Sequence, residues 1–325
     1  MKKRFVLAIV EDFRIYECMI DELISMGFDV DLFIAYSRMN VSACDKQINS
    51  LLKRLSVKKY DDRKLALKNK FEEGLISRIG TYDYGLVIRP DAFGQCFLDC
   101  LNKQTKMLIA YQWDGMKRFT GAADTIAYFD NFFVYEDGDV KQYPGTVKAE
   151  NFYFGNVLNE YKENEKKYDA YYLGSYDERI NQVIDLCEDL VERGLSLNIK
   201  IPCSSRDRKK LKNFSYIDTR KVFFTYRENL RMASQSRIIL DFGHEKLHEG
   251  LSFRPFEALG FGVKCITTNP IIKEQKFYNE RNFHYYTRKS DVDSFLQSPF
   301  VEDHAAMNYS FSSWLDRKLT VRNGV

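Results

Sequence analysis

The sequence predicts an α/β fold of two Rossmann-like, doubly wound domains that face a cleft, and two observations carry this prediction. A unit made of an apolar strand, an amphipathic helix and a second strand occurs twice, about half a chain apart. Further apolar strands follow each copy after intervals long enough for a helix. Parallel strands need a crossover connection, which a helix supplies, so each copy is expected to open its own parallel sheet.

The first copy starts close to the amino terminus. Residues 5–10 form an apolar strand and residues 30–35 form the second strand. The helix between them has apolar residues every three or four positions and ends at Gly27. Three more strands of the first sheet are expected at residues 84–88, 106–111 and 132–135.

The second copy has the same order of elements. Its strands are residues 170–173 and 195–201, and the amphipathic helix between them ends at Gly194. Two more strands of the second sheet are expected at residues 237–242 and 264–268.

A charged stretch without glycine, residues 160–167, is typical of an exposed linker and predicts the domain boundary. The sequence therefore predicts domains at residues 1–160 and 161–303. Residues 304–325, which include Trp314 and Leu315, are expected to form a last helix that packs across both domains.

Charge, hydropathy and cysteine content exclude several classes of protein. A formal net charge of +3 is too small to indicate nucleic acid as a partner. The apolar run near the start ends at Glu11, which is too early for a signal peptide, and no stretch is long enough to span a membrane. The seven cysteines are odd in number and include no C-x-x-C pair, so neither a disulfide framework nor a cysteine zinc site is expected. These features predict a cytoplasmic protein.

The pentapeptide HEKLH, residues 244–248, matches the HExxH motif of zinc hydrolases. In that motif His244 and His248 would hold zinc while Glu245 acts as a general base. Gly243 and Gly250 flank the motif and limit any helix to about two turns, whereas such zinc sites occupy the middle of a long helix. A zinc hydrolase therefore remains only the less favoured alternative.

Three segments resemble one known family. They are Gly174-Ser175 after the first strand of the second half, GLSFRPFEALGFGVKCITTN at residues 250–269, and YQWDG at residues 111–115. They are similar to nucleotide-sugar glycosyltransferases of the two-Rossmann (GT-B) architecture, above all those that assemble bacterial lipopolysaccharide or capsule. The resemblance covers most of the chain and is strongest at residues 238–286.

The resemblance implies an enzyme that moves a sugar from a nucleotide-sugar donor to a growing bacterial surface glycan. The acceptor would be a glycan of the lipopolysaccharide core, O-antigen or capsule, free or lipid-linked, and would bind the first domain. The second domain would bind the donor. The nucleotide-sugar is a co-substrate, so no cofactor is expected. A nonenzymatic nucleotide- or sugar-binding protein with the same fold remains an alternative.

The resemblance also implies roles for individual residues of the second domain. A carboxylate at Glu257 would accept hydrogen bonds from the ribose hydroxyls, and Arg254 would hold the diphosphate through its planar fork. Glu249 would lie near the donor sugar if the enzyme is retaining, which leaves the stereochemistry open. The other expected donor-binding residues are Gly174, Ser175, Gly250, Thr267, Thr268 and Asn269. The alternative is that Glu257 is a solvated helix residue that pairs with Arg254.

An inverting transfer needs a general base near the acceptor hydroxyl. Asp12, Asp91 and Asp114 each follow an expected strand of the first domain. Asp114 is the first choice, because Trp113 beside it could stack on a sugar, and Asp91 is the second. Aspartates at such turns also cap helices, and this is the favoured interpretation for Asp12.

Two charge patterns remain. Residues 53–70 carry eight Lys or Arg against two Asp. This pattern is typical of a solvated helix face. It is also typical of a surface that binds the anionic inner face of the cytoplasmic membrane. Three Asp-x-Asp pairs, Asp29/Asp31, Asp137/Asp139 and Asp291/Asp293, do not follow central strands convincingly. They are interpreted as structural, and no metal is expected.

Overall fold

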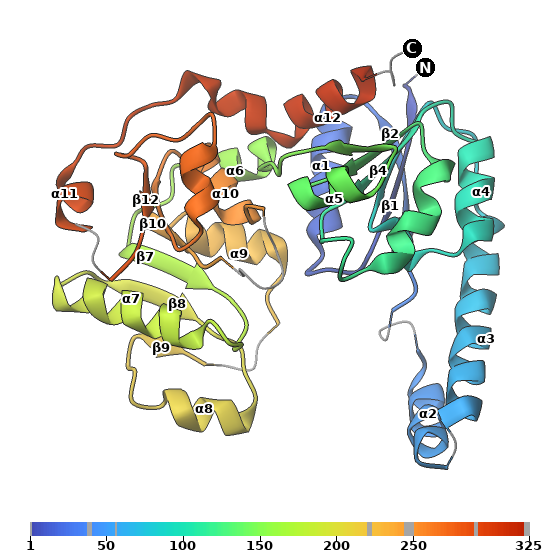
Figure 1. Cartoon of the computed structure of the whole chain (residues 1–325), viewed down its shortest axis with the longest axis horizontal. Coiled ribbons are helices and arrows are strands. Elements are labelled where there is room, and N and C mark those ends of the chain that lie inside the picture. Colours follow the sequence, from blue (N-terminus) through green and yellow to red (C-terminus); the bar gives the residue numbers. More distant parts are fainter. Residues whose placement is uncertain are drawn as a thin grey trace. The chain divides into compact units, whose positions relative to one another are not determined.

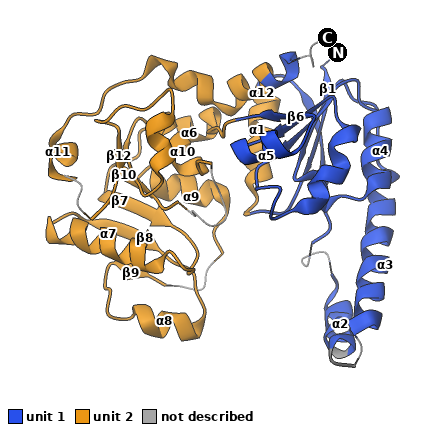
Figure 2. Cartoon of the chain, viewed as in Figure 1, with its two compact units in different colours: residues 1–12, 26–149, 318–325 blue, residues 13–25, 150–317 orange. Residues whose placement is uncertain are grey.

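A computed structural model of the chain describes residues 2–37, 41–55, 57–219, 223–243, 250–288 and 292–321. The chain forms two compact units (Figure 2). Unit 1 contains residues 1–12, 26–149 and 318–325, and unit 2 contains residues 13–25 and 150–317. Each unit holds one six-stranded sheet in which every strand pair is parallel. The predicted pair of Rossmann-like α/β domains is therefore confirmed.

The sheet of unit 1 has the strand order β2-β1-β3-β4-β5-β6. The strands are β1 (Arg4–Ile9), β2 (Asp29–Ile34), β3 (Tyr84–Ile88), β4 (Leu108–Gln112), β5 (Asn131–Val134) and β6 (Thr146–Lys148). The helices are α2 (Ala43–Leu55), α3 (Val57–Ile76), α4 (Gln95–Lys103) and α5 (Asp137–Gln142), with 3₁₀ segments η2 (Pro90–Ala92) and η3 (Thr120–Tyr128). The order reverses direction between β1 and β3, so the carboxyl ends of these two strands form a topological switch point.

Helices α2 and α3 form a hairpin that extends away from the sheet of unit 1 (Figure 1). The basic stretch at residues 53–70 lies on this hairpin, mostly on α3. Val57 and Leu65 are exposed apolar residues of the same hairpin. The fold thus presents basic and apolar side chains together on a projecting element.

The sheet of unit 2 has the strand order β12-β11-β10-β7-β8-β9. Its strands are β7 (Tyr168–Leu173), β8 (Leu197–Lys200), β9 (Ile217–Asp218), β10 (Ser236–Asp241), β11 (Lys264–Thr267) and β12 (Phe283–Tyr285). The helices are α1 (Ile15–Ser25), α6 (Gly155–Tyr161), α7 (Ile180–Glu192), α8 (Ser205–Leu211), α9 (Tyr226–Ala233), α10 (Phe253–Phe261), α11 (Val292–Gln297) and α12 (Phe311–Thr320), with η4 (Pro270–Glu274) and η5 (His304–Tyr309). Here the chain winds outward in both directions from the central pair β7 and β10, whose carboxyl ends form the switch point.

The structure places α1 with unit 2, although it directly follows the first strand of unit 1. Its Glu22 is buried and accepts hydrogen bonds from both the backbone N–H and the side-chain amide of Asn156, at 2.7 and 2.9 Å. Asp21 forms an ion pair with Arg227. These contacts hold α1 against α6 and α9.

The boundary between the units falls after residue 149, earlier than the linker expected at residues 160–167. Phe152 packs against Phe311 and Trp314 of α12, at ring distances of 5.0 and 4.9 Å. The indole N–H of Trp314 donates to the carbonyl of Glu150. This aromatic packing attaches the segment after residue 149 to unit 2, whereas Lys318 onward belongs to unit 1.

Candidate functional site

The carboxyl edge of the sheet in unit 2 gathers the residues predicted to bind a donor. In open parallel sheets, ligands bind outside the carboxyl ends of the strands at the point where the strand order reverses. Here Gly174 follows β7, Gly243 follows β10 after one residue, and Thr267 ends β11. The predicted residue Glu249 and the histidines His244 and His248 lie outside the described residues.

Arg254, in the first turn of α10, is half-buried beside the switch point. Its Nη2 donates to the carbonyl oxygen of Leu173, the last residue of β7, and its guanidinium lies 5.0 Å from the ring centre of Tyr172. An arginine side chain has five N–H donors. Among the residues that the structure describes, the bond to Leu173 is the one hydrogen bond that the Arg254 side chain donates. Burial lowers the pKa of Arg254, but the negative charges nearby, including Asp241 and Glu257, raise it overall. Arg254 thus holds a positive charge with most of its donors uncommitted.

Glu257 lies one turn further along α10 and is 2% exposed. Its Oε1 accepts a 2.5 Å hydrogen bond from the hydroxyl of Tyr226, while no described residue donates to Oε2. Burial raises the pKa of Glu257, and Tyr226 and Arg254 lower it in part. The alternative of a solvated helix residue is therefore wrong for Glu257, and no ion pair joins it to Arg254 within the described residues.

Asp241, at the end of β10, fixes the start of α10 and was not predicted as a site residue. It is 1% exposed. Its Oδ1 accepts from the Ser252 hydroxyl at 2.7 Å, and its Oδ2 accepts from the Thr267 hydroxyl at 2.6 Å. Ser252 in turn caps α10, because its hydroxyl accepts from the backbone N–H of Arg254. One carboxylate therefore ties the amino end of α10 to the ends of β10 and β11.

The three consecutive residues 267–269, which were predicted to face a donor, hold loops in place through their side chains. Thr267 is fully buried, and its hydroxyl also accepts from the N–H of Asn269. The Thr268 hydroxyl accepts from the N–H of Gly243, and the Asn269 side-chain amide donates to the carbonyl of Gly250. Their contact with a ligand stays a prediction. In the structure, Thr268 holds the loop after β10 and Asn269 holds the segment before α10.

Gly174 and Ser175 begin the loop after β7. The N–H of Gly174 donates to the carbonyl of Lys200, and a Cβ at this position would lie 2.0 Å from the hydroxyl of Tyr172. Glycine is therefore required here by the packing of Tyr172. Ser175 is exposed, and its hydroxyl has no partner in the described part of the chain, so it can reach a ligand at this edge.

A second arginine at this edge, Arg179, was missed by the sequence analysis. Both carboxylate oxygens of Asp177 accept from its fork, at 3.0 and 2.6 Å, and its Nη1 donates to the carbonyl of Phe242. Arg179 directly precedes α7, the helix of the second repeat. A basic residue at this position was the sequence signal that could have identified it. It links the loop after β7 to the end of β10.

The carboxyl edge of the sheet in unit 1 holds a cluster of charges centred on Arg89. Its fork binds both oxygens of Asp91 at 2.7 Å, and its Nη1 donates to Asp114 at 2.7 Å. Arg89 follows β3, adopts a left-handed backbone at φ 58, and stacks on the ring of Phe119 at 3.4 Å. Non-glycine residues in this conformation cost about 1–3 kcal/mol and gather at functional sites. The two aspartates predicted as bases are thus brought together by an arginine that the sequence analysis missed.

Asp12, after β1, faces the same cluster. Burial raises the pKa of Asp12, the charge of Asp114 raises it further, and the charges of Arg89 and Arg118 lower it. No hydrogen bond or ion pair to its carboxylate forms within the described residues, so the prediction that Asp12 caps a helix is wrong. A carboxylate with a raised pKa and free oxygens is suited to accept a proton.

Of the three Asp-x-Asp pairs, Asp291 lies outside the described residues, Asp29 is exposed, and the other four aspartates have protein partners, Asp137 through an ion pair with Lys148. Asp31 accepts from Arg4 and from the hydroxyl of Tyr82. Asp139 accepts from the N–H of Met116, and Asp293 pairs with Arg193. Across the part of the chain that the structure describes, no group of histidine, cysteine and acidic residues has the geometry to hold a metal ion. No described helix is both long enough and apolar enough to cross a bilayer.

Comparison with solved structures identifies the fold. A UDP-forming α,α-trehalose-phosphate synthase from Burkholderia xenovorans matches with a TM-score of 0.56 and 9% identity, over 98% of each chain. The N-terminal domain of a trehalose-6-phosphate phosphatase from Candida albicans matches with a TM-score of 0.53 and 8% identity, over 98% of this chain and 96% of that one. An α,α-trehalose 6-phosphate synthase from Burkholderia multivorans gives 0.51 and 9%, over 98% and 95%.

No protein-family profile matches the chain, and no curated protein matches it in sequence. At identities this low, the likeness shows the fold: two parallel-sheet α/β domains of six strands each, as the GT-B resemblance implied.

Proposed function

We propose that the protein is a metal-independent glycosyltransferase that moves a sugar from a nucleotide-sugar donor to an acceptor hydroxyl. The observation that carries the proposal is Arg254, which stays charged beside the switch point of unit 2 with most of its donors uncommitted. The fold likeness to sugar-phosphate synthases supports it.

In the proposed reaction, the acceptor oxygen forms a bond to the anomeric carbon of the donor sugar. The bond between that carbon and the phosphate oxygen breaks, and the nucleoside diphosphate or monophosphate leaves with the electron pair. The leaving group gains negative charge as the bond breaks. A positive charge fixed beside it therefore stabilises the transition state more than the ground state.

Arg254 supplies that charge. Its planar fork matches two phosphate oxygens and does not lose its proton at any working pH. The backbone N–H groups at the start of the nine-residue helix α10 add to the attraction, because the amino end of a helix favours negative charge. Ser252 and Asp241 hold this helix end in place.

Glu257 gives the nucleotide half of the donor a second contact. Oε1 is bound to Tyr226, and we propose that the other oxygen accepts from the ribose hydroxyls. The proposed roles of Gly174, Ser175, Gly250, Thr267, Thr268 and Asn269 are to shape the loops around this ligand. Glu249 would approach the sugar in a retaining mechanism.

For an inverting reaction, we propose that a carboxylate at the carboxyl edge of unit 1 takes the acceptor proton. Asp12 is the best candidate, because its oxygens are free and burial raises its pKa. Asp114 and Asp91, the bases predicted from sequence, bind Arg89. In this arrangement they orient the arginine and adjust the charge around Asp12.

For the acceptor, we propose a growing bacterial surface glycan, free or lipid-linked, as the resemblance of residues 111–115 and 250–269 implies. The hairpin of α2 and α3 would then meet the anionic inner face of the cytoplasmic membrane. Each basic residue near such a surface contributes about 1 kcal/mol. Binding to anionic vesicles, but not to zwitterionic vesicles, at low salt and its loss at high salt test this part.

The donor proposal is tested by thermal unfolding against a panel of nucleoside diphosphates, nucleoside monophosphates and nucleotide-sugars. A ligand at 100 times its dissociation constant stabilises the folded state by about 2.7 kcal/mol. We expect at least one base series to raise the Tm, and Arg254→Gln to abolish the effect. Arg206→Gln, at an exposed position of α8 in the same unit, is the matched control and should leave the shift unchanged. No shift with any nucleotide would refute the proposal.

One observation favours the rival, a nonenzymatic nucleotide- or sugar-binding protein: Arg89 already engages two of the three candidate bases. A product assay with the stabilising nucleotide-sugar separates the two, because a binding protein releases no nucleotide on addition of acceptor glycans. Zinc analysis of the purified protein tests the hydrolase alternative at His244 and His248.

A further inference from the structure

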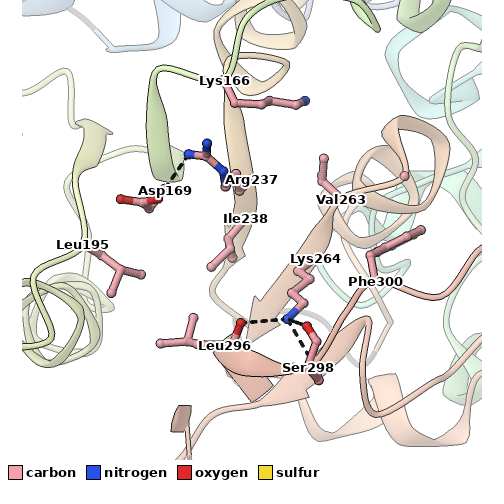
Figure 3. Close-up of a pocket in the computed structure, with 11 residues that line it drawn as sticks. Lys166, Asp169, Leu195, Arg237, Ile238, Val263, Lys264, Leu296, Ser298 and Phe300 are labelled. Atoms are coloured by element: carbon pink, nitrogen blue, oxygen red, sulfur yellow. Dashed lines mark hydrogen bonds and ion pairs between the residues drawn. The ribbon is translucent and has the colours of Figure 1, made fainter. Parts of the chain in front are cut away.

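A cavity of about 480 Å³ lies at the opposite, amino edge of the sheet in unit 2. Its walls come from the starts of β7, β10 and β11 and from the segment that ends α11 (Figure 3). This volume lies in the range of small-molecule sites, about 300–1,000 Å³. Three basic side chains and one acidic side chain line it, Lys166, Arg237, Lys264 and Asp169, which gives a net charge of +2.

Lys264 does not have donors left for a ligand. Its ammonium donates to the carbonyls of Phe295, Leu296 and Ser298, and Leu296 and Ser298 line the same cavity. Cations are favoured at the carboxyl ends of helices, where carbonyls lack partners. Lys264 therefore supports the end of α11 and adds positive potential to the cavity without a direct contact.

Lys166 and Arg237 are different, because both keep donors. Lys166 gives one hydrogen bond, to the carbonyl of Ser234 at 2.8 Å, and Arg237 gives one, to Asp169 at 3.3 Å. No other described residue accepts from either side chain. Burial and then the charge of Arg237 lower the pKa of Lys166. The positive charge of Arg237 therefore acts on Lys166 at this end of the cavity, and an anion bound by both would relieve this repulsion.

The remaining lining is mostly apolar. Figure 3 shows Lys166 and Arg237 at one end, Lys264 and Ser298 at the other, and apolar side chains around the space between. The apolar side chains are Leu195, Ile238, Val263, Leu296 and Phe300. A ligand that fills this space needs an apolar body in addition to its charge, because polar groups placed against these walls lose hydrogen bonds to water.

We propose that this cavity is a second binding site, for a small organic dianion of the phosphate-monoester type, in which Lys166 and Arg237 hold the phosphate and the apolar walls hold the body. The charge of such a ligand matches the net charge of the lining. The site is separate from the donor site, because it lies at the amino edge of the sheet and the donor residues lie at the carboxyl edge.

Helix α10 connects the two edges. Arg254 and Glu257 lie in its first two turns, and its carboxyl end stops at Gly262, which lines the cavity and adopts φ 65. A nine-residue helix is about 13 Å long at 1.5 Å per residue. The two sites are therefore about one short helix apart.

The test is calorimetry on the full chain with phenyl phosphate, inorganic phosphate and benzyl alcohol as probes. We expect phenyl phosphate to bind at least 10-fold more tightly than either of the others, because only it satisfies both the charge and the apolar walls. Lys166→Gln and Arg237→Gln should each weaken phenyl phosphate about 10-fold or more, since hydrogen bonds between charged groups contribute about a decade or more. Lys166→Arg should retain binding.

Lys167→Gln is the matched control, because Lys167 is the exposed neighbour with the same charge and does not line the cavity. It should bind like the parent, as should Arg254→Gln, whose defect is confined to the donor site. Because burial lowers the pKa of Lys166, binding by the parent should take up protons at alkaline pH, where a phosphate beside Lys166 favours its ammonium form, and Lys166→Gln should remove this uptake.

Three results would overturn the proposal. The first is no binding of phenyl phosphate at millimolar concentrations. The second is equal affinity for inorganic phosphate, which would exclude the organic ligand class. The third is loss of binding in Arg254→Gln but not in Lys166→Gln, which would place the probe at the donor site. None of these depends on whether the protein transfers sugars, so failure here is distinct from failure of the proposed function.

Discussion

The hydroxyl of Tyr226, the first residue of α9, donates a 2.5 Å hydrogen bond to Oε1 of Glu257 in α10. Glu257 is almost completely buried, whereas Tyr226 is half-buried. This bond fixes the orientation of the carboxylate and leaves one oxygen without a partner among the described residues. The same contact thus stabilises a buried acid, and in the proposed donor site the other oxygen would accept hydrogen bonds from the ligand.

Glu257→Gln should weaken nucleotide binding by about 10- to 100-fold with little change in kcat. The substitution keeps the shape but removes the charge, and hydrogen bonds to charged groups contribute about 1.5–3 kcal/mol. The ribose contact changes little as the sugar leaves, so its loss appears in KM. Calorimetry with the free nucleotide measures the effect, and unchanged affinity would place the donor site elsewhere.

Tyr226→Phe separates positioning from direct binding. It leaves Glu257 chemically intact but removes its partner, and an unsatisfied buried group costs about 1–3 kcal/mol of folding free energy. We therefore expect a lower Tm, a further rise in the pKa of Glu257 and a smaller loss of nucleotide affinity than for Glu257→Gln. An equal loss in both variants would mean that the hydroxyl of Tyr226 itself contacts the nucleotide.

Arg254→Lys should keep the positive charge but lose the planar fork that matches two phosphate oxygens. We expect affinity for the nucleoside diphosphate to fall by about 10-fold while affinity for the corresponding nucleoside is unchanged. Competition binding with both ligands measures the ratio. A parallel loss for the nucleoside would show that Arg254 only supports the end of β7.

Asp12→Asn should lower turnover by about 10²-fold or more, as expected for a lost general base, without weakening donor binding.

Asp114→Asn tests whether the charge of Asp114 acts on Asp12. Because the charge of Asp114 raises the pKa of Asp12, its removal should shift the acidic limb of the kcat–pH profile to lower pH. If instead Asp114→Asn abolishes turnover and Asp12→Asn is near normal, Asp114 is the base, as the sequence predicts. Asp91→Asn, near normal in either case, completes the set.

Glu22→Gln should change how stability depends on pH. Burial raises the pKa of Glu22 from 4.5 to about 7, and its hydrogen bonds to backbone N–H groups of α6 lower it in part. The folded state therefore binds its proton more tightly than the unfolded state. The resulting stabilisation is present below pH 4.5 and is lost as pH rises toward about 7, with a slope of at most ~1.4 kcal/mol per unit.

Denaturant unfolding of the parent and Glu22→Gln across pH 4 to 8 measures this difference. The stability of the variant relative to the parent should increase as pH rises through that window. A constant difference would show that Glu22 has an ordinary pKa in the folded protein.

The central strands could be predicted because the apolar run that marks each of them is a local property of the sequence. A strand buried on both faces is a continuous apolar run, so the expected strands at residues 5–10, 84–88 and 237–242 agree with β1, β3 and β10 to within a residue at each end. The sequence also predicts a short helix from Phe253 that ends at Gly260 or Gly262, and α10 ends at Gly262, which adopts a left-handed conformation. The edge strands β6, β9 and β12 were missed. They have two or three residues each, too few to show a period.

The sequence by itself determined the two α/β repeats, the order of their strands along the chain and the helix that carries Arg254 and Glu257. The reason is that the spacing of apolar residues and the glycines that end helices are signals within a few residues of one another. Tertiary structure alone decided that α1 packs with unit 2, that Arg89 binds Asp91 and Asp114, and that Lys166 and Arg237 meet in one cavity. Each of these depends on side chains far apart in sequence, whose approach is set by how whole elements pack rather than by any local preference.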